Sequence, residues 1–420
     1  MAYVPVAFIL AGMTAYTVLA GADFGAGFWQ LFSAPGERGQ MIRDHAHHSM
    51  GPVWEANHVW LIFVLVVGWT AYPVAFGSIS STLAAPLLIA AIGIIFRGAA
   101  YALRGQGASR VAENLLAVSS VLTPFALGTA VGAIATGRVP VGNAAGNPLT
   151  SWLNPASVLI GALAVVFSGY LAAVYLAADS TRSSERAVAT PFRHRALAAG
   201  LASGGLALAG LLVMRHSGLN LTRGGALAAV CVSAAAGLLT LGLCWRSRFG
   251  LARLTAALSV AAVVIGWAAA QTPRLLPGLT VTQAAAGRST LIALIIAVGC
   301  GAVILIPSLA LLYTLYLRGD LDTPEHDSPT ATPAAAAIES ATPAAGVEGL
   351  SAGVEGLSAG GEAAPARVRA RVGVAVAGLV VGTGLLVFAD SAWAHAAGVA
   401  FLIACAVAVF VLATGDPTDA

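Results

Sequence analysis

The chain has 420 residues, of which 58% are hydrophobic and only 9% are charged, and its mean hydropathy is +0.85. A soluble domain carries about 25% charged residues, so this composition excludes an ordinary soluble protein and indicates a membrane protein. The net charge of +3 is small and spread along the chain, which argues against a nucleic-acid partner.

The apolar segments are long enough to serve as membrane helices, each of which needs about 20 residues. Eleven segments qualify: 5–31, 53–75, 79–101, 115–136, 155–178, 196–215, 224–245, 252–271, 290–317, 372–389 and 392–413. The sequence therefore predicts an all-α integral membrane protein. The first segment lacks a charged leader and a separate cleavage signal, so we expect it to be retained as a span.

The arginines favour one orientation of these helices. If the N-terminus lies outside, 16 of the 21 basic residues, all of them arginine, fall in inner segments and 5 in outer ones. Positive residues are enriched on the cytoplasmic side of membrane proteins. A missed helix would invert every later loop, so the bias supports both the number of helices and a cytoplasmic C-terminus.

Composition divides the chain into three parts. Residues 319–370 are rich in Ala, Pro, Gly and Glu, and the heptapeptide 346–352 is repeated at 353–359. Such a segment cannot bury a core, so it is predicted to be a disordered cytoplasmic linker. It separates a nine-helix core, 1–318, from an extra transmembrane hairpin at 371–414.

A polar cluster opens the second apolar segment. Trp54, Glu55, Asn57 and His58 lie within five residues, and a helix would place Glu55 and His58 on one face. A charged group costs about 2.5–3.5 kcal/mol at the centre of a membrane helix and less near its end. A chain this apolar would rarely keep such a cluster for packing alone, so we predict that it is functional.

Asp23 and Arg97 are two further charged residues inside apolar segments. In the predicted topology Asp23 and Glu55 both fall in the inner half of the membrane, and Arg97 lies close enough to pair with either acid. Carboxylates entering from the cytoplasm are typical of a proton path. A buried acid–arginine pair that holds helices together is an equally weighted alternative.

Cofactor and metal motifs are weak. The inner segment contains His45, His47 and His48, but Asp44 is the one acidic residue at ligand spacing, so no metal site is predicted. His58 is expected to form a hydrogen bond rather than to ligate haem, and no His/Met pattern demands a haem. The four cysteines form no CxxC pair and are expected to pack as small apolar residues. P-loop, Rossmann and serine-hydrolase motifs are absent.

Four motifs together resemble a known family. They are GADFGAG at 21–27, PVWEANHVWL at 52–61, Tyr72-Pro73 and FRGAAYALR at 96–104. They resemble subunit II of the cytochrome bd-type quinol oxidases, also called the cytochrome d ubiquinol oxidase subunit II family. The resemblance covers about residues 1–318, and its specific part lies in the first hundred.

The resemblance implies two four-helix bundles plus a ninth helix, paired with a similarly folded subunit I. That partner would carry the haems, of types b and d, and the loop that oxidises quinol, while this chain would bind none. The complex would reduce oxygen to water in a bacterial plasma membrane and generate a proton-motive force. Membrane lipid, quinone and small single-helix subunits are further implied partners.

The match carries over residue by residue. Asp23, Trp54, Glu55, Asn57 and Arg97 stand where the family has its characteristic residues, with Glu55 replacing an aspartate. His58 stands where the family usually has Glu or Gln, and Ala102 where it often has an acid. We predict a proton path through Glu55, Asp23 and His58, with Arg97, Trp54 and Asn57 as structural or charge partners.

Two alternatives stay open. Because Ala102 removes one plausible proton relay, the chain could be a divergent assembly partner that conducts no protons. It could also be a secondary transporter, but such proteins carry polar, broken helices in both halves. Residues 155–317 are nearly devoid of such groups, which argues against transport.

Overall fold

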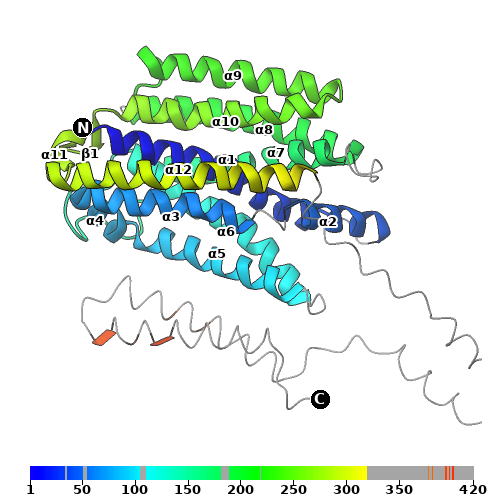
Figure 1. Cartoon of the computed structure of the whole chain (residues 1–420), viewed down its shortest axis with the longest axis horizontal. Coiled ribbons are helices and arrows are strands. Elements are labelled where there is room, and N and C mark those ends of the chain that lie inside the picture. The colour runs from blue at the N-terminus through cyan, green and yellow to red at the C-terminus, as the bar shows by residue number, and fades with distance from the viewer. Residues whose placement is uncertain are drawn as a thin grey trace, which may run out of the picture.

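The computed structural model describes residues 1–33, 36–50, 54–104, 110–180, 189–217 and 219–318, with isolated positions between 377 and 401. These residues form a bundle of long helices that run roughly side by side (Figure 1). The predicted linker, 319–370, and nearly all of the predicted hairpin, 371–414, lie outside the described residues.

Twelve helices and one small hairpin make up the described chain. The helices are α1 (Val4–Leu31), α2 (Glu37–Met50), α3 (Trp54–Ala71), α4 (Pro73–Thr82), α5 (Ala84–Arg104), α6 (Arg110–Ala135), α7 (Pro155–Asp179), α8 (Ala189–His216), α9 (Gly224–Trp245), α10 (Phe249–Gln271), α11 (Val281–Ala284) and α12 (Arg288–Arg318). Eight are long and apolar enough to cross a membrane, and Asn57–Ala71 of α3 is a shorter apolar helix. The prediction of an all-α membrane protein is confirmed, while the division into two four-helix bundles plus one helix stays a prediction.

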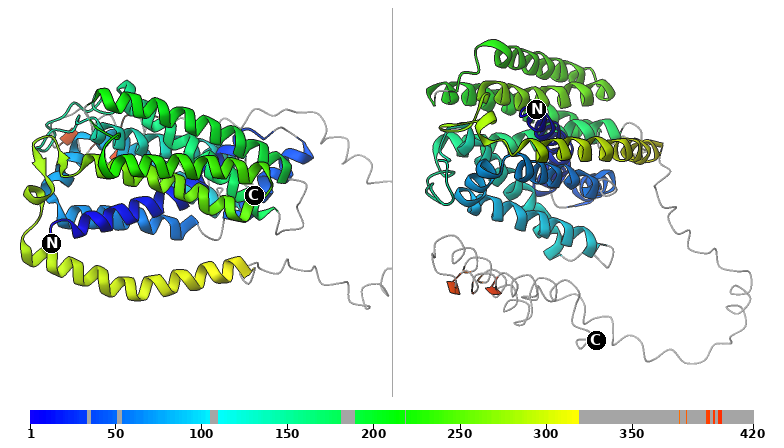
Figure 2. Two further views of the ribbon diagram at one scale, coloured as in Figure 1. Left: turned by 90° about the horizontal axis from the view of Figure 1, so that it is seen from above. Right: turned by 60° about the vertical axis from the view of Figure 1, so that its left-hand side comes forward.

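Helix α1 occupies the centre of the bundle. It packs against α3, α6, α7 and α10, and its residues 20–27 are buried on every side. Figure 1 and the right-hand view of Figure 2 place α9 and α10 on one side of it and α5 on the other. A helix buried all round needs small residues for close contacts: a Cβ on Gly25 would lie 1.9 Å from the Ser168 carbonyl oxygen.

The second predicted span ends earlier than expected. The sequence predicts one helix over 53–75 and the next from 79, but α3 ends at Ala71 and α4 fills the interval before α5. Proline disfavours helical geometry in the residue before it and has no N–H to donate. Tyr72 accordingly leaves helical geometry, with φ −137° and ψ 61°, and Pro73 begins α4.

Two predicted loops contain ordered elements. The segment between the first two spans forms α2, whose Ile42 and Ala46 lie one turn apart and are buried in a cluster with residues of α7 and α8. The segment after α10 forms an antiparallel hairpin of β1 (Arg274–Leu276) and β2 (Leu279–Thr280).

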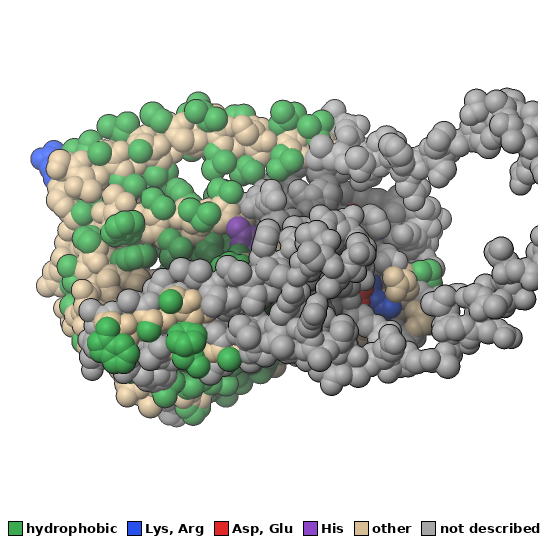
Figure 3. All heavy atoms as spheres, turned by 90° about the horizontal axis from the view of Figure 1, so that it is seen from below, with side chains coloured by type: hydrophobic (Ala, Val, Ile, Leu, Met, Phe, Trp, Pro, Cys, Tyr) green, Lys and Arg blue, Asp and Glu red, His purple; other side chains and the backbone are tan. Residues whose placement is uncertain are grey.

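Charged groups are scarce on the surface between the helix ends. On the face shown in Figure 3, the described surface consists of hydrophobic side chains among backbone and other atoms, and few charged side chains are in view. This distribution suits a bundle surrounded by lipid.

Candidate functional site: a buried ion pair in an apolar bundle

Arg97 and Asp23 form a buried ion pair between α5 and α1. The Arg97 Nε donates to Asp23 Oδ2 at 2.8 Å, and its Nη2 donates to Oδ1 at 2.6 Å. Nη2 also donates to the Asp23 backbone carbonyl oxygen at 2.6 Å. Both side chains are 0% exposed. The opposite charges compensate each other, which reduces the cost of holding them in an apolar interior.

Two hydroxyl groups complete the coordination of this pair. Arg97 Nη1 donates to Ser120 Oγ on α6 at 2.7 Å, and the Tyr101 hydroxyl donates to Asp23 Oδ1 at 2.9 Å. The guanidinium also lies over the ring of Phe24, 4.9 Å from its centroid. Three helices, α1, α5 and α6, are therefore joined through one charged cluster.

Glycine is required where α1 meets α6 at this cluster. A Cβ on Gly27 would lie 2.0 Å from Ser120 Oγ and 3.3 Å from Arg97 Nη1. Any larger side chain would force the serine away from the guanidinium. This gives Gly27 a physical role beyond its place in the glycine-rich motif.

The α3 residues lie beside the same part of α1. Asn57 is buried, and its Nδ2 donates to the Leu19 carbonyl oxygen at 3.3 Å. The His58 ring meets the rings of Tyr16 and Phe24 edge to face, with centroids 5.9 and 6.0 Å apart. Phe24 therefore lies between His58 and the guanidinium of Arg97. The side chains of Trp54 and Glu55 lie outside the described residues, so the predicted approach of Glu55 to Asp23 stays a prediction.

Of the histidines at positions 45, 47 and 48, the structure describes the side chain of His45. His45 is buried, with its Nε2 3.1 Å from the Leu176 carbonyl oxygen and its ring against Phe192. Among the described residues, no three His, Cys, Asp or Glu side chains group closely enough to hold a metal ion. The side chains of His47 and His48 lie outside the description.

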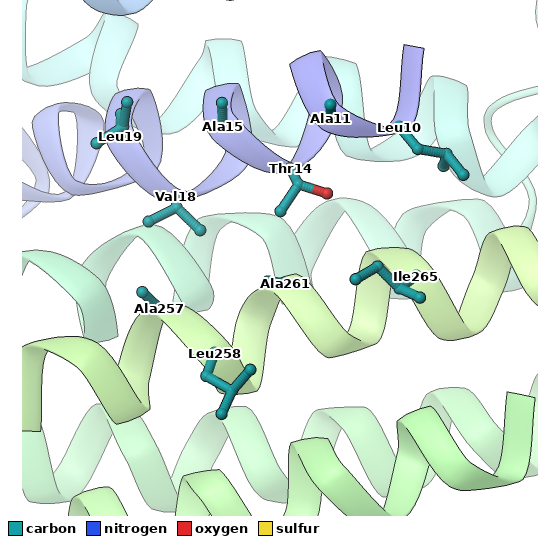
Figure 4. Close-up of a pocket in the computed structure, with 10 residues that line it drawn as sticks. All are labelled: Leu10, Ala11, Thr14, Ala15, Val18, Leu19, Ala257, Leu258, Ala261 and Ile265. Carbon is teal, nitrogen blue, oxygen red and sulfur yellow. The ribbon is translucent and has the colours of Figure 1, made fainter. Parts of the chain in front are cut away.

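A groove between two of the long helices does not fit a haem. It lies between α1 and α10, has a volume of about 520 Å³ and is lined by Leu, Ala, Val, Ile and one threonine (Figure 4). A haem needs an axial ligand such as His, Met, Cys or Tyr. None of these is among the described residues that line the groove.

Sequence reasoning found the charged pair but not its hydroxyl partners. The sequence singles out both Asp23 and Arg97, and the structure pairs them with each other. Tyr101 was detectable, because it follows Arg97 by four residues and so shares its helix face. Ser120 had no signal beyond a hydroxyl in an apolar segment.

These features define a class: a membrane protein of several apolar helices with an ionised pair inside the bundle. The chain belongs to the cytochrome bd terminal oxidase subunit II family, whose model matches residues 1–316. Cytochrome bd ubiquinol oxidase subunit 2 of Bacillus subtilis (strain 168) is 29% identical over 114 residues, which are 26% of this chain and 33% of that one. The match thus spans about a third of that relative's length.

A solved structure shares the fold. A chain in the structure of bd oxidase from Geobacillus thermodenitrificans matches with a TM-score of 0.63 and 23% identity, covering 75% of this chain and 98% of that one. At this identity the similarity establishes the fold alone. The family match, for its part, ends at residue 316.

Proposed function

We propose that this chain is the non-haem-ligating membrane subunit of a cytochrome bd-type quinol:oxygen oxidoreductase. It would pack against a haem-bearing subunit I in the plasma membrane of a bacterium, with its N-terminus outside and its C-terminus in the cytoplasm. Family membership and the fold of the bd oxidase chain support this assignment. Haems b and d in the partner would pass electrons from quinol to oxygen, and this chain would not be catalytic alone.

The observation that carries the proposal is the buried charged cluster between α1 and α5. Asp23 and Arg97 are completely buried, and Asn57 and His58 lie against the same stretch of α1. Ionisable groups inside membrane bundles are costly and typically serve ion or proton movement. We propose that protons enter from the cytoplasm at Glu55, pass His58 on the next turn of α3, and reach the region of Asp23.

The other residues would hold this path in place. Arg97 balances the charge of Asp23, and the 3.3 Å hydrogen bond from Asn57 to the Leu19 carbonyl joins α3 to α1. Trp54 would close the cytoplasmic end of α3. His58 suits proton transfer because an imidazole changes its charge near neutral pH.

One observation favours a second candidate, an assembly partner that conducts no protons. Both carboxylate oxygens of Asp23 already accept hydrogen bonds, Oδ1 from Arg97 and Tyr101 and Oδ2 from Arg97. A carboxylate held in this way is suited to joining helices. Under this reading Glu55 and His58 would be dispensable for turnover.

The first test is the composition of the complex. We expect the tagged chain to co-purify with a membrane protein whose reduced-minus-oxidised spectrum shows haems b and d. A preparation without haem would contradict the assignment to an oxidase.

The second test separates the two candidates. In the purified complex, Glu55→Gln should lower quinol-driven oxygen uptake at least about tenfold, since a positioned proton-transfer group contributes about 10²–10⁴-fold. The control is Asp179→Asn. Asp179 is the last residue of α7, and its carboxylate lies 4.0 Å from an Arg253 nitrogen. Normal turnover of Glu55→Gln with full haem content would favour the assembly role.

A further inference from the structure

Tyr16 carries a buried hydroxyl that the ion pair does not use. The residue is 9% exposed, and its hydroxyl forms no hydrogen bond within the part of the chain that is described. A phenylalanine would fill the same apolar space without leaving a polar atom unsatisfied. A buried hydroxyl of this kind needs a partner, and an ordered water is the usual one.

The position of Tyr16 connects it with the proposed proton path. Tyr16 and Phe24 belong to one buried cluster with residues of α3, α5 and α6. The His58 ring lies between these two aromatic residues, 5.9 Å from the Tyr16 ring and 6.0 Å from the Phe24 ring, centroid to centroid.

A second unsatisfied hydroxyl adjoins the same cluster. Thr123 is 0% exposed, and its Oγ1 likewise forms no hydrogen bond within the described chain. It lies on α6 one turn beyond Ser120, the serine that binds Arg97. Its hydroxyl faces α5, because a Cβ on Gly93 would lie 2.1 Å from Oγ1. Two buried hydroxyls, one on the residue beside His58 and one facing Gly93, therefore lack protein partners within the described chain, which favours buried water between these helices.

We propose that Tyr16 is a further proton relay, joined through buried water to His58 and to the Asp23–Arg97 pair. This inference rests on the proposed function. Asp23 follows Tyr16 by seven residues, about 10 Å along the helix axis, so the relay would extend the path from the inner half of the membrane to its middle. The hydroxyl oxygen accepts a proton from water on the His58 side and releases its own to water beyond, so one proton moves and Tyr16 stays neutral.

Tyr16→Phe in the purified oxidase complex tests this relay, since the change removes one oxygen and keeps the ring against His58. We expect full haem content, quinol-driven oxygen uptake reduced about tenfold and a larger solvent deuterium isotope effect. Tyr170→Phe is the control, because Tyr170 is a buried tyrosine in the separate cluster around α7. An unchanged rate and isotope effect in Tyr16→Phe would overturn the relay.

The failure of this inference is distinguishable from failure of the proposed function. If Glu55→Gln is slow and Tyr16→Phe is normal, the path exists without Tyr16; if both are normal, the path itself is wrong. Should Tyr16→Phe fail to assemble, 3,5-difluorotyrosine at position 16 keeps the hydroxyl and makes it more acidic. The pH profile of turnover should then shift, and an unshifted profile would overturn the relay.

Discussion

Arg97 binds both carboxylate oxygens of Asp23, a residue 74 positions earlier in the chain, through donor–acceptor distances of 2.8 and 2.6 Å. The two charges join α5 to the central helix α1 in a region without solvent contact. Removing one partner of a buried pair leaves an uncompensated charge, which costs more than the pair itself contributes. We therefore expect the pair to make the packing of these two helices specific.

Asp23→Asn should lower the free energy of unfolding by about 3–5 kcal/mol, because Arg97 would remain buried without its counter-charge. Unfolding of the purified chain by a denaturing detergent measures this change. The double variant Asp23→Leu/Arg97→Met, which replaces the pair by apolar side chains, should be closer to the wild type than the single variant. If the Asp23→Asn variant is as stable as the wild type, Arg97 does not depend on Asp23 for its counter-charge and the prediction is wrong.

Ser120→Ala should also destabilise the bundle. The change leaves Arg97 Nη1 without the hydroxyl to which it donates at 2.7 Å, and a hydrogen bond to a charged group contributes about 1.5–3 kcal/mol. Ser119→Ala is a matched control, since the Ser119 hydroxyl donates within its own helix to the Leu116 carbonyl. Equal losses in the two variants would refute a special role for Ser120.

Gly25→Ala should disturb the contact between α1 and α7. The added Cβ would lie 1.9 Å from the Ser168 carbonyl oxygen and 2.7 Å from the Ala172 Cβ, so the helices must separate. Overpacking of this kind costs about 1–3 kcal/mol. Gly204→Ala is the control: no described atom lies within 4 Å, and alanine is the better helix former by up to about 1 kcal/mol. The prediction fails if both variants unfold alike.

Most of the helices were predictable because a segment that is surrounded by lipid must be apolar. In lipid, the backbone N–H and C=O groups of a segment of about 20 apolar residues must form hydrogen bonds with each other, and an α-helix provides these bonds within the segment. The proline at position 73 indicates a break after Tyr72, but the apolar sequence continues on both sides of it, so the sequence pattern favours a single long span. Helix α2 escaped prediction because its buried side chains, Ile42 and Ala46, are few and pack against distant helices.

The site was predictable only in part, for a related reason. An acid and an arginine in apolar segments stand out in the sequence, so Asp23 and Arg97 could be named. Which acid pairs with Arg97 depends on the rotation of α1 and α5 about their axes. That rotation is fixed by glycine contacts such as Gly27 against Ser120, which no local pattern reveals.

Proton uptake during the reaction of the reduced complex with oxygen tests the central claim most directly. A pH-sensitive dye on the cytoplasmic side would follow uptake in the wild type and in Glu55→Gln. The proton path predicts uptake slowed at least about tenfold in the variant, with haem content unchanged. Uptake at the wild-type rate would contradict it.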